Sequence, residues 1–133
     1  MILNLNRYLQ EYTSMGTAGG LFHFRDRLLS GGTDVLLVLN GDVCADFPLE
    51  DMLASHDAEA TLVTLMATEA TRQQAVNYGC VVEDEADHSV LHYVEKPNTY
   101  IGPWINCGVY VLSAAKTFAM LQEVYRRKQE AGQ

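Results

Sequence analysis

The strongest hydrophobic signal in this chain is an unbroken apolar run, Val35–Leu39, followed directly by Asn40, Gly41 and Asp42. A half-exposed strand alternates apolar with polar residues, whereas a strand buried on both faces of a parallel sheet reads as a continuous apolar run. We therefore predict a central strand over these residues, with both of its faces buried.

Apolar positions on either side of this run predict alternating helices and strands. Residues 18–29 have helical periodicity, and their apolar stripe consists of Ala18, Leu21, Phe22, Leu28 and Leu29. Thr17 is placed to cap this helix, and Gly31-Gly32 to end it. A short helix over 48–56 begins at Pro48, because proline suits the first helical turn. Strands over 1–9 and 60–66 complete a β-α-β-α-β order, which favours a parallel, doubly wound sheet.

The pattern changes in the second half of the chain. Residues 68–76 are polar and predict a loop or a single helical turn. Two short β-rich runs, 80–83 and 89–95, flank the acidic segment 84–87 and predict a hairpin. A strand over 104–112 is interrupted by Asn106 and Gly108, and a final amphipathic helix begins near Ser113.

Composition and charge limit the class of protein and the kind of partner. The chain has 133 residues, 48% of them hydrophobic and 20% charged, which is ordinary for one globular domain or a piece of one. With 9 basic and 17 acidic residues its net charge is −8. This charge disfavours nucleic acid, whose phosphate backbone requires a basic face. No segment has the length and hydrophobicity of a signal peptide or a membrane span.

The cysteines and histidines do not predict a metal site. Cys44, Cys80 and Cys107 form no CxxC pair and lie among apolar residues, which favours a reduced, cytoplasmic setting. The four histidines show no ligand spacing. We interpret the histidines as structural or surface residues: His23, His56, His88 and His92.

Polar residues at the ends of the predicted strands are candidates for chemistry. In open α/β sheets, ligands bind beyond the carboxyl ends of the strands. Asp42 is placed there and could hold a hard cation or a hydroxyl, although Asn40-Gly41-Asp42 also has the composition of a plain turn. Gly16-Thr17 precedes a helix whose first N–H groups are unpaired, but it is equally a tight connection.

The end of the hairpin offers a second group of candidates. Glu95 could accept two sugar hydroxyls and Lys96 could meet a phosphate, and in an extended segment the two would point to opposite sides. The alternative is a charged strand terminus. Asn106 is either satisfied by neighbouring backbone or turned towards a polar ligand, with Gly108 leaving space.

Taken in order, these segments resemble the sugar-1-phosphate nucleotidyltransferase family. The resemblance extends from Arg7 to Gln133 and is closest to the GDP-mannose pyrophosphorylase branch, alpha type. Five motifs carry it: Glu11 with Gly16-Thr17-Ala18-Gly19, Leu39-Asn40-Gly41-Asp42-Val43, Asn77-Tyr78-Gly79-Cys80-Val81-Val82, Val94-Glu95-Lys96-Pro97, and Ile105-Asn106-Cys107-Gly108-Val109-Tyr110.

The resemblance implies a Rossmann-like, GT-A-like nucleotidyltransferase domain, with a mixed, mostly parallel sheet and helices on both faces. In this branch mannose 1-phosphate and GTP react to GDP-mannose and pyrophosphate, and catalysis is positioning with charge stabilisation. By motif, Asp42 would coordinate Mg²⁺ and act in catalysis with Lys96, which would meet the sugar phosphate.

The remaining site residues implied by the resemblance are binding residues. Glu11, Gly16 and Thr17 would contact the nucleotide. Gly79, Glu95 and Asn106 would contact the sugar.

The chain also departs from the family pattern. It has no counterpart of the basic, glycine-rich triphosphate loop, of the second metal-binding aspartate or of the left-handed β-helix. We therefore expect residues 1–133 to form a partial, catalytically incomplete nucleotidyltransferase domain.

Three hypotheses about function follow. The first is a piece of a guanylyltransferase-like protein. The second is a regulatory subunit that binds GDP-mannose and acts through a catalytic beta-type partner, with a homo-oligomer as the other possible assembly. The third is an unrelated α/β binding domain, which five ordered motifs disfavour.

The same departure predicts a problem of stability. Without the family's first βα unit, the strand Val35–Leu39 would lack a neighbour that its apolar faces require. We therefore expect an exposed sheet edge and a tendency to associate.

Overall fold

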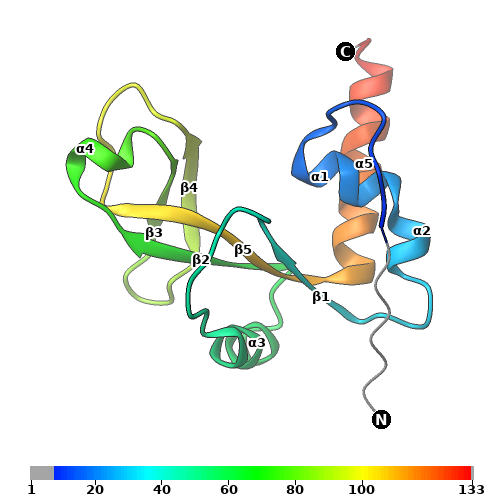
Figure 1. The fold of residues 1–133 in the computed structure, drawn as a ribbon, viewed down its shortest axis with the longest axis horizontal. Helices are drawn as coiled ribbons and strands as arrows, with labels where there is room; N and C mark the ends of the chain where they lie inside the picture. Colours follow the sequence, from blue (N-terminus) through cyan, green and yellow to red (C-terminus); the bar gives the residue numbers. More distant parts are fainter. Residues whose placement is uncertain (1–7, 133) are drawn as a thin grey trace. The chain divides into compact units, whose positions relative to one another are not determined.

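The computed structural model describes residues 8–132, which divide into two compact units. Unit 1 combines residues 8–34 with 113–132, and unit 2 is Val35–Leu112. Figure 1 shows helices in unit 1 and a β-sheet with two helices in unit 2. No helix within 8–132 combines the length and the hydrophobicity that crossing a membrane requires. The strand predicted over 1–9 lies largely outside the described residues, and 8–10 have no regular structure.

Unit 1 is built from three helices, α1 (Gly16–His23), α2 (Arg25–Leu28) and α5 (Ala114–Glu130). The prediction of one continuous helix over 18–29 was wrong, because the helix breaks at Phe24. Thr17 does not cap it either: Met15 is the N-cap residue. The glycine stop was correct, since Gly31 and Gly32 have φ values of 97° and 76° that favour glycine.

Helix α1 packs against α5 through a flat, small-residue face. Gly19 and Gly20 are buried, and a Cβ on Gly19 would lie 3.1 Å from the Tyr125 hydroxyl. One turn on, the rings of Phe22 and Tyr125 stack with centroids 4.6 Å apart. Glycine at position 19 therefore leaves space for the Tyr125 side chain of α5 against α1.

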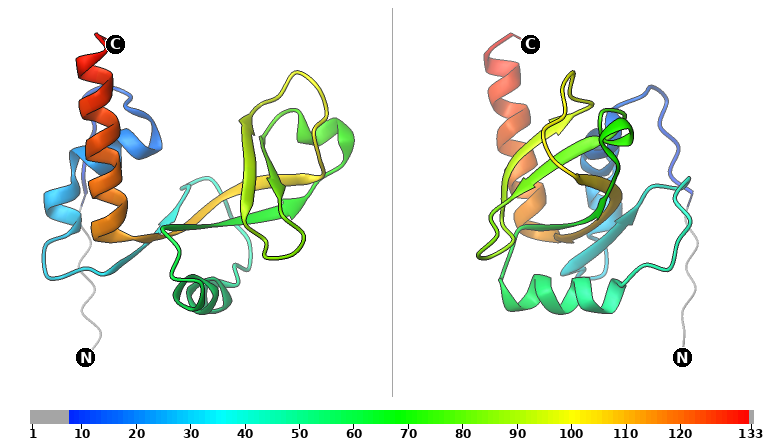
Figure 2. Two further views of the ribbon diagram at one scale, coloured as in Figure 1. Left: turned by 180° about the vertical axis from the view of Figure 1, so that it is seen from behind. Right: turned by 90° about the vertical axis from the view of Figure 1, so that its left-hand side faces the viewer.

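Unit 2 is organised around β5 (Trp104–Ser113), which pairs with three other strands. Its neighbours are β1 (Val35–Leu39), β2 (Val63–Glu69) and β3 (Gly79–Glu83). The fifth strand, β4 (Val90–Glu95), forms the predicted hairpin with β3, which both views in Figure 2 show side by side. The prediction of a mostly parallel sheet was wrong: β2–β5, β3–β4 and β3–β5 all pair antiparallel. Helices on both faces of the sheet stay a prediction.

Two short helices complete unit 2. Helix α3 (Leu49–Ala58) begins after Pro48, as predicted, and packs against β2. Helix α4 (Arg72–Ala75) is the predicted single turn, and Thr71 caps it in a capping box with Gln74. Strand β2 begins three residues later than its apolar pattern predicted, because residues 60–62 form the turn that follows α3.

The core of unit 2 lies between α3 and the sheet. Val109 and Val111 of β5 are fully buried and pack with Met52 of α3, and burial of each valine contributes roughly 2 kcal/mol. A second cluster joins Ala75, Cys80 and Ile105. Strand β1, by contrast, was wrongly predicted to be buried on both faces, because Leu37 and Leu39 are each 40% exposed. Among residues 8–132, β1 lies at the end of the strand order, in agreement with the expected sheet edge.

Candidate functional site

A β-bulge in β5 sets the position of Asn106. Asn106 pairs with Ala67 of β2 and Tyr110 pairs with Leu65, so three residues of β5 oppose the single Met66. Gly108 lies in the bulge with φ of 72°, a conformation that favours glycine. The predicted interruption of this strand is therefore a bulge, which re-aims the Asn106 side chain without ending the strand.

Four side chains at this end of the sheet form a connected network, here called the polar cluster: Tyr93, Glu95, Asn106 and Tyr110. The Tyr93 hydroxyl donates to Glu95 Oε2 at 2.7 Å. Asn106 Nδ2 donates to the hydroxyls of Tyr110, at 2.7 Å, and Tyr93, at 3.3 Å. The cluster thus joins β4 to β5 through side chains, beyond the backbone ladder that links each of them to its neighbours.

Gly79 leaves the space that the polar cluster occupies. It is buried and pairs with Glu95 across the hairpin. A Cβ at position 79 would lie 2.0 Å from the Tyr93 hydroxyl and 3.0 Å from Glu95 Oε2. The three residues expected to contact the sugar, Gly79, Glu95 and Asn106, are therefore brought together, and Tyr93 is the residue that connects them.

The segment after β1 reaches the same end of β5. The Asn40 N–H donates to the Gly108 carbonyl at 2.9 Å, and a Cβ on Gly108 would lie 2.2 Å from Asn40 Nδ2. Gly41 has open space around it, and Asp42 is exposed two residues beyond Asn40. Asn40-Gly41-Asp42 is thus both a strand exit and a neighbour of the bulge.

Asp42 does not form a metal centre with other described side chains. Within residues 8–132, no group of three or more His, Cys, Asp or Glu side chains is placed to hold a metal ion. Mg²⁺ is commonly bound by one or two carboxylates together with substrate phosphates. Asp42 fits the role of a single carboxylate ligand, and the described residues do not fit a self-contained magnesium site.

Lys96 lies just past the end of β4, and its backbone is not extended. Its φ is 44°, and its N–H donates to the Tyr78 carbonyl at 3.2 Å. The expectation that Glu95 and Lys96 point to opposite sides of an extended segment was therefore wrong. Positive φ is uncommon outside glycine and marks local strain, and the residue that follows, Pro97, is buried.

The residues expected to contact the nucleotide lie in unit 1. Glu11 Oε2 accepts from the Met15 N–H at 3.4 Å, which places a carboxylate beside the N-terminus of α1, where negative charge is favourable. A Cβ on Gly20 would overlap Glu11 Oε1, so Glu11 lies directly against the helix. Gly16, with φ of 70°, opens α1 and has no atom near its Cβ position, and Thr17 follows it on the exposed side.

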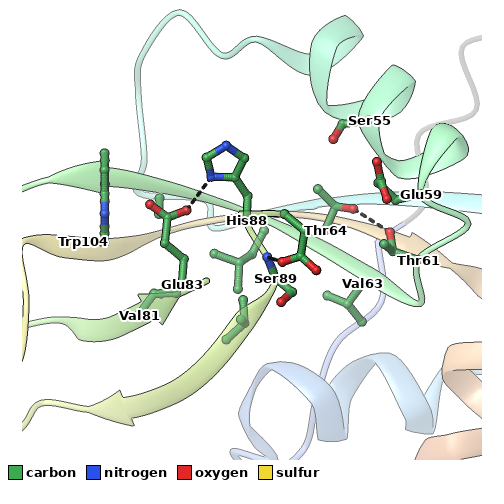
Figure 3. A pocket seen from close by; sticks show the side chains of 14 residues that line it. Ser55, Glu59, Thr61, Val63, Thr64, Val81, Glu83, His88, Ser89 and Trp104 are labelled. Atoms are coloured by element: carbon green, nitrogen blue, oxygen red, sulfur yellow. Dashed lines mark hydrogen bonds and ion pairs between the residues drawn. The ribbon is translucent and has the colours of Figure 1, made fainter. Parts of the chain in front are cut away.

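A pocket of about 660 Å³ lies elsewhere in unit 2 (Figure 3). Its wall includes the ion pair between Glu83 and His88, 3.0 Å apart, and the ring of Trp104. Further carboxylates, those of Glu59 and Asp87, also line it. This acidic lining disfavours phosphate, and none of the expected site residues is part of the pocket.

Tyr93 and Tyr110 belong to the polar cluster, although neither is among the predicted site residues. A signal for each was present in the spacing along the strands. Tyr93 is two residues before Glu95 and Tyr110 four after Asn106, and side chains two or four apart on a strand share one face. Each tyrosine could therefore have been paired with the polar residue already identified.

Comparison with known proteins identifies relatives over almost the whole chain. The family model described as nucleotidyl transferase matches residues 4–132. The chain is 52% identical over 130 residues to the mannose-1-phosphate guanylyltransferase regulatory subunit alpha of Drosophila melanogaster, and 50% over 127 residues to the human protein of the same name. A probable mannose-1-phosphate guanyltransferase of Schizosaccharomyces pombe is 44% identical over 127 residues. Each match covers 96% of this chain and 30% of the relative.

Proposed function

Because this chain belongs to the nucleotidyl transferase family, we propose that it binds GDP-mannose as part of a mannose-1-phosphate guanylyltransferase-like protein with a regulatory role. The observation that carries this proposal is the polar cluster beside Gly79, in which Glu95 offers an exposed carboxylate at a strand end. A carboxylate there can accept from sugar hydroxyls. The regulatory role is supported by the names of the Drosophila and human relatives.

Binding of GDP-mannose to the chain, measured by calorimetry, tests this proposal. We expect Glu95→Gln to weaken binding about tenfold or more, since a hydrogen bond to a charged group contributes about 1.5–3 kcal/mol. Glu83→Gln is the matched control, because Glu83 lies at the other end of the hairpin, opposite Val90. Equal affinity of both variants and the parent chain would contradict a sugar site at Glu95.

Each remaining site residue is proposed for one contact. Glu11 would accept from the N1–H and amino group of guanine, since an ionised carboxylate only accepts, while Gly16 and Thr17 would offer backbone N–H groups to the nucleotide. Lys96 would meet the sugar phosphate as a point charge. We expect Lys96→Gln to weaken binding of mannose 1-phosphate and to leave binding of free mannose unchanged.

Magnesium is proposed only as a ligand-dependent ion at Asp42. One carboxylate and the phosphates of a bound nucleotide would together provide the oxygen ligands that Mg²⁺ prefers. We expect Mg²⁺ to strengthen GTP binding in the parent chain and to have little effect in Asp42→Asn. An equal Mg²⁺ effect in both chains would remove Asp42 from the proposal.

Catalysis is the second candidate function, favoured by the name of the fission yeast relative and by Asp42 at the end of β1. We expect this chain alone to release no pyrophosphate from GTP and mannose 1-phosphate. Turnover that is lost in Asp42→Asn would favour the catalytic role over the regulatory one.

The proposed assembly is a hetero-oligomer with a catalytic beta-type subunit, with a homo-oligomer as the alternative. It is supported by the Drosophila and human relatives, which are named as regulatory subunits. A cytoplasmic location is supported by Cys44, Cys80 and Cys107, all of which are free thiols. Co-purification with a beta-type subunit, followed by sedimentation, would distinguish the two assemblies.

A further inference from the structure

The orientation of the Asn106 amide is fixed by a backbone group. The Gly108 N–H lies 2.9 Å from the amide oxygen Oδ1. A backbone N–H can only donate, so Oδ1 must face it and Nδ2 must face the tyrosines. Both tyrosine hydroxyls therefore accept a hydrogen bond from Asn106.

This orientation decides where the tyrosine protons go. Since Tyr93 accepts from Asn106, its own proton is free to be donated to Glu95 Oε2. The pKa of Tyr93 is raised, mainly by burial and further by the bond to Glu95 and its charge, while the bond from Asn106 acts in the opposite direction. Tyr93 thus remains a donor throughout the neutral range. Tyr110 accepts from Asn106 and keeps its proton for another partner.

The hydrogen-bonding positions of the polar cluster that remain available to a ligand are mainly acceptors. An ionised carboxylate has about four lone-pair positions, and Tyr93 uses one of those on Glu95. Both N–H groups of the Asn106 amide are already committed, which leaves it only as an acceptor. The hydroxyl proton of Tyr110 is the donor that remains. Such a surface matches a ligand rich in hydroxyl donors. It does not match a fully ionised phosphate, which has hydrogen-bond acceptors and no donors.

We propose that Tyr93 is a positioning residue that sets sugar specificity: its hydroxyl holds the Glu95 carboxylate beside Asn106, where the carboxylate reads two neighbouring hydroxyls of a hexose. This inference rests on the proposed GDP-mannose site and identifies how that site distinguishes sugars. A carboxylate held in one orientation accepts well from one arrangement of two hydroxyls and poorly from its epimer. A carboxylate free to rotate accepts from both.

The same arrangement gives Gly79 a role that requires no contact with the ligand. A Cβ at position 79 would overlap the Tyr93 hydroxyl and also its Cζ atom, 2.5 Å away. Glycine at this position therefore keeps Tyr93 in place, and it acts on the sugar through Tyr93 and Glu95. Substitution of Gly79 should reproduce the loss of Tyr93 function while the hydroxyl is still present.

Calorimetry with GDP-mannose, GDP-glucose and GDP tests the role of Tyr93. In Tyr93→Phe we expect the preference for GDP-mannose over GDP to fall about tenfold, as for loss of a hydrogen bond to a charged group. The discrimination between GDP-mannose and GDP-glucose should fall with it, and affinity for GDP should stay within about twofold. Tyr100→Phe is the matched control, because Tyr100 contacts Arg72 and is not part of the cluster. Gly79→Ala is the second variant and should show the same losses.

A double-mutant cycle separates positioning from a direct contact. If Tyr93 acts through Glu95, Tyr93→Phe in the Glu95→Gln background should change GDP-mannose affinity by less than about twofold. Tyr93→Phe that folds and keeps its full sugar preference would overturn the role of Tyr93 and leave the GDP-mannose site standing. A parent chain that binds GDP-mannose no more tightly than GDP would overturn both.

Discussion

The candidate nucleotide segment of unit 1 and the candidate sugar site of unit 2 are held by contacts that differ in their separation along the sequence. Glu11 bonds to the backbone of Met15, four residues on. In the polar cluster, Tyr93 bonds to Asn106, thirteen residues on and in another strand. The first arrangement depends on one helix end, whereas the second depends on the register of the sheet and on a bulge.

This difference predicts which region tolerates substitution. An exposed side chain such as Glu11 can rotate away from an added atom with little cost. Tyr93 is fixed by hydrogen bonds to Glu95 and Asn106, and its hydroxyl fits only because Gly79 has no Cβ. Glycine substitutions test the contrast directly, because glycines in both units lie against the candidate residues.

Gly108→Ala should have the largest effect. The substitution places a Cβ at φ of 72° and 2.2 Å from Asn40 Nδ2, so backbone strain adds to a clash. We expect the free energy of unfolding to fall by about 2–3 kcal/mol, measured by urea denaturation. Gly41→Ala is the control, because no atom lies within 4 Å of its Cβ position, and it should change stability by less than about 0.5 kcal/mol. Equal effects would show that the bulge is not rigid.

Gly79→Ala and Gly20→Ala form the next test, with one variant in each unit. Both added Cβ atoms overlap a side-chain oxygen, Tyr93 Oη at 2.0 Å and Glu11 Oε1 at 1.8 Å. We expect Gly79→Ala to lower the free energy of unfolding by about 1–2 kcal/mol, because the hydrogen-bonded tyrosine must move. Gly20→Ala should be close to neutral, since Glu11 can rotate and alanine favours the helix by about 1 kcal/mol. A larger loss in Gly20→Ala would mean that Glu11 is held as firmly as Tyr93.

The local sequence pattern predicted most helices and strands. It failed where the structure depends on strand direction or on tertiary contacts. The hairpin, α3, the single turn of α4 and the start of α5 follow from turn chemistry and capping near each element. An apolar run reports hydrophobicity but neither strand direction nor strand order, so the antiparallel pairing of β2 and β3 with β5 was missed. The break at Phe24 was missed because the apolar spacing along 18–29 reports one face of a helix and does not show where its backbone is interrupted.

For the site, motif order carried the analysis further than residue chemistry did. The predicted family is confirmed by the match over residues 4–132. Glu95 and Asn106 were candidates from residue chemistry, the motifs added Gly79 and the sugar role, and the three residues converge on one end of the sheet. Tyr93 and Tyr110 follow from strand periodicity once those residues are known. The left-handed backbone of Lys96 could not be predicted, because the residue before a proline usually favours extended conformations.

The exposed edge of the sheet gives a smaller effect that concerns unit 2 alone. Leu37 and Leu39 lie on one face of the edge strand β1, and each is 40% exposed. Association through β1 would bury apolar surface contributing roughly 1 kcal/mol per chain. Replacing both leucines with lysine should lower the association constant several-fold in sedimentation, since charge blunts edge strands. Leu91→Lys, on the opposite edge strand β4, is the control; if it alone reduces association, the interface is at β4.

The smallest effect should come from unit 1, where α5 carries a local network of ion pairs. Hydrogen bonds from Arg126 and then Arg127 lower the pKa of Glu123 from 4.5 to about 2. Because the folded-state pKa is depressed, the stabilisation is present above pH 4.5 and is lost as the pH falls from there to about 2.

Nuclear magnetic resonance titration of Glu123 should therefore give a midpoint near 2, which returns towards 4.5 in Arg126→Ala with Arg127→Ala. The two arginine side chains are largely exposed and that of Glu123 is 40% exposed, so the stabilisation should be small and should weaken in high salt. Arg25→Ala is the control, because Arg25 lies over Phe22 and should leave the titration of Glu123 unchanged. A midpoint near 4.5 in the parent chain would mean that these ion pairs do not persist in solution. The polar cluster would then be the better ordered of the two networks, because its side chains are held on neighbouring strands of a sheet and Asn106 is fixed by the Gly108 N–H.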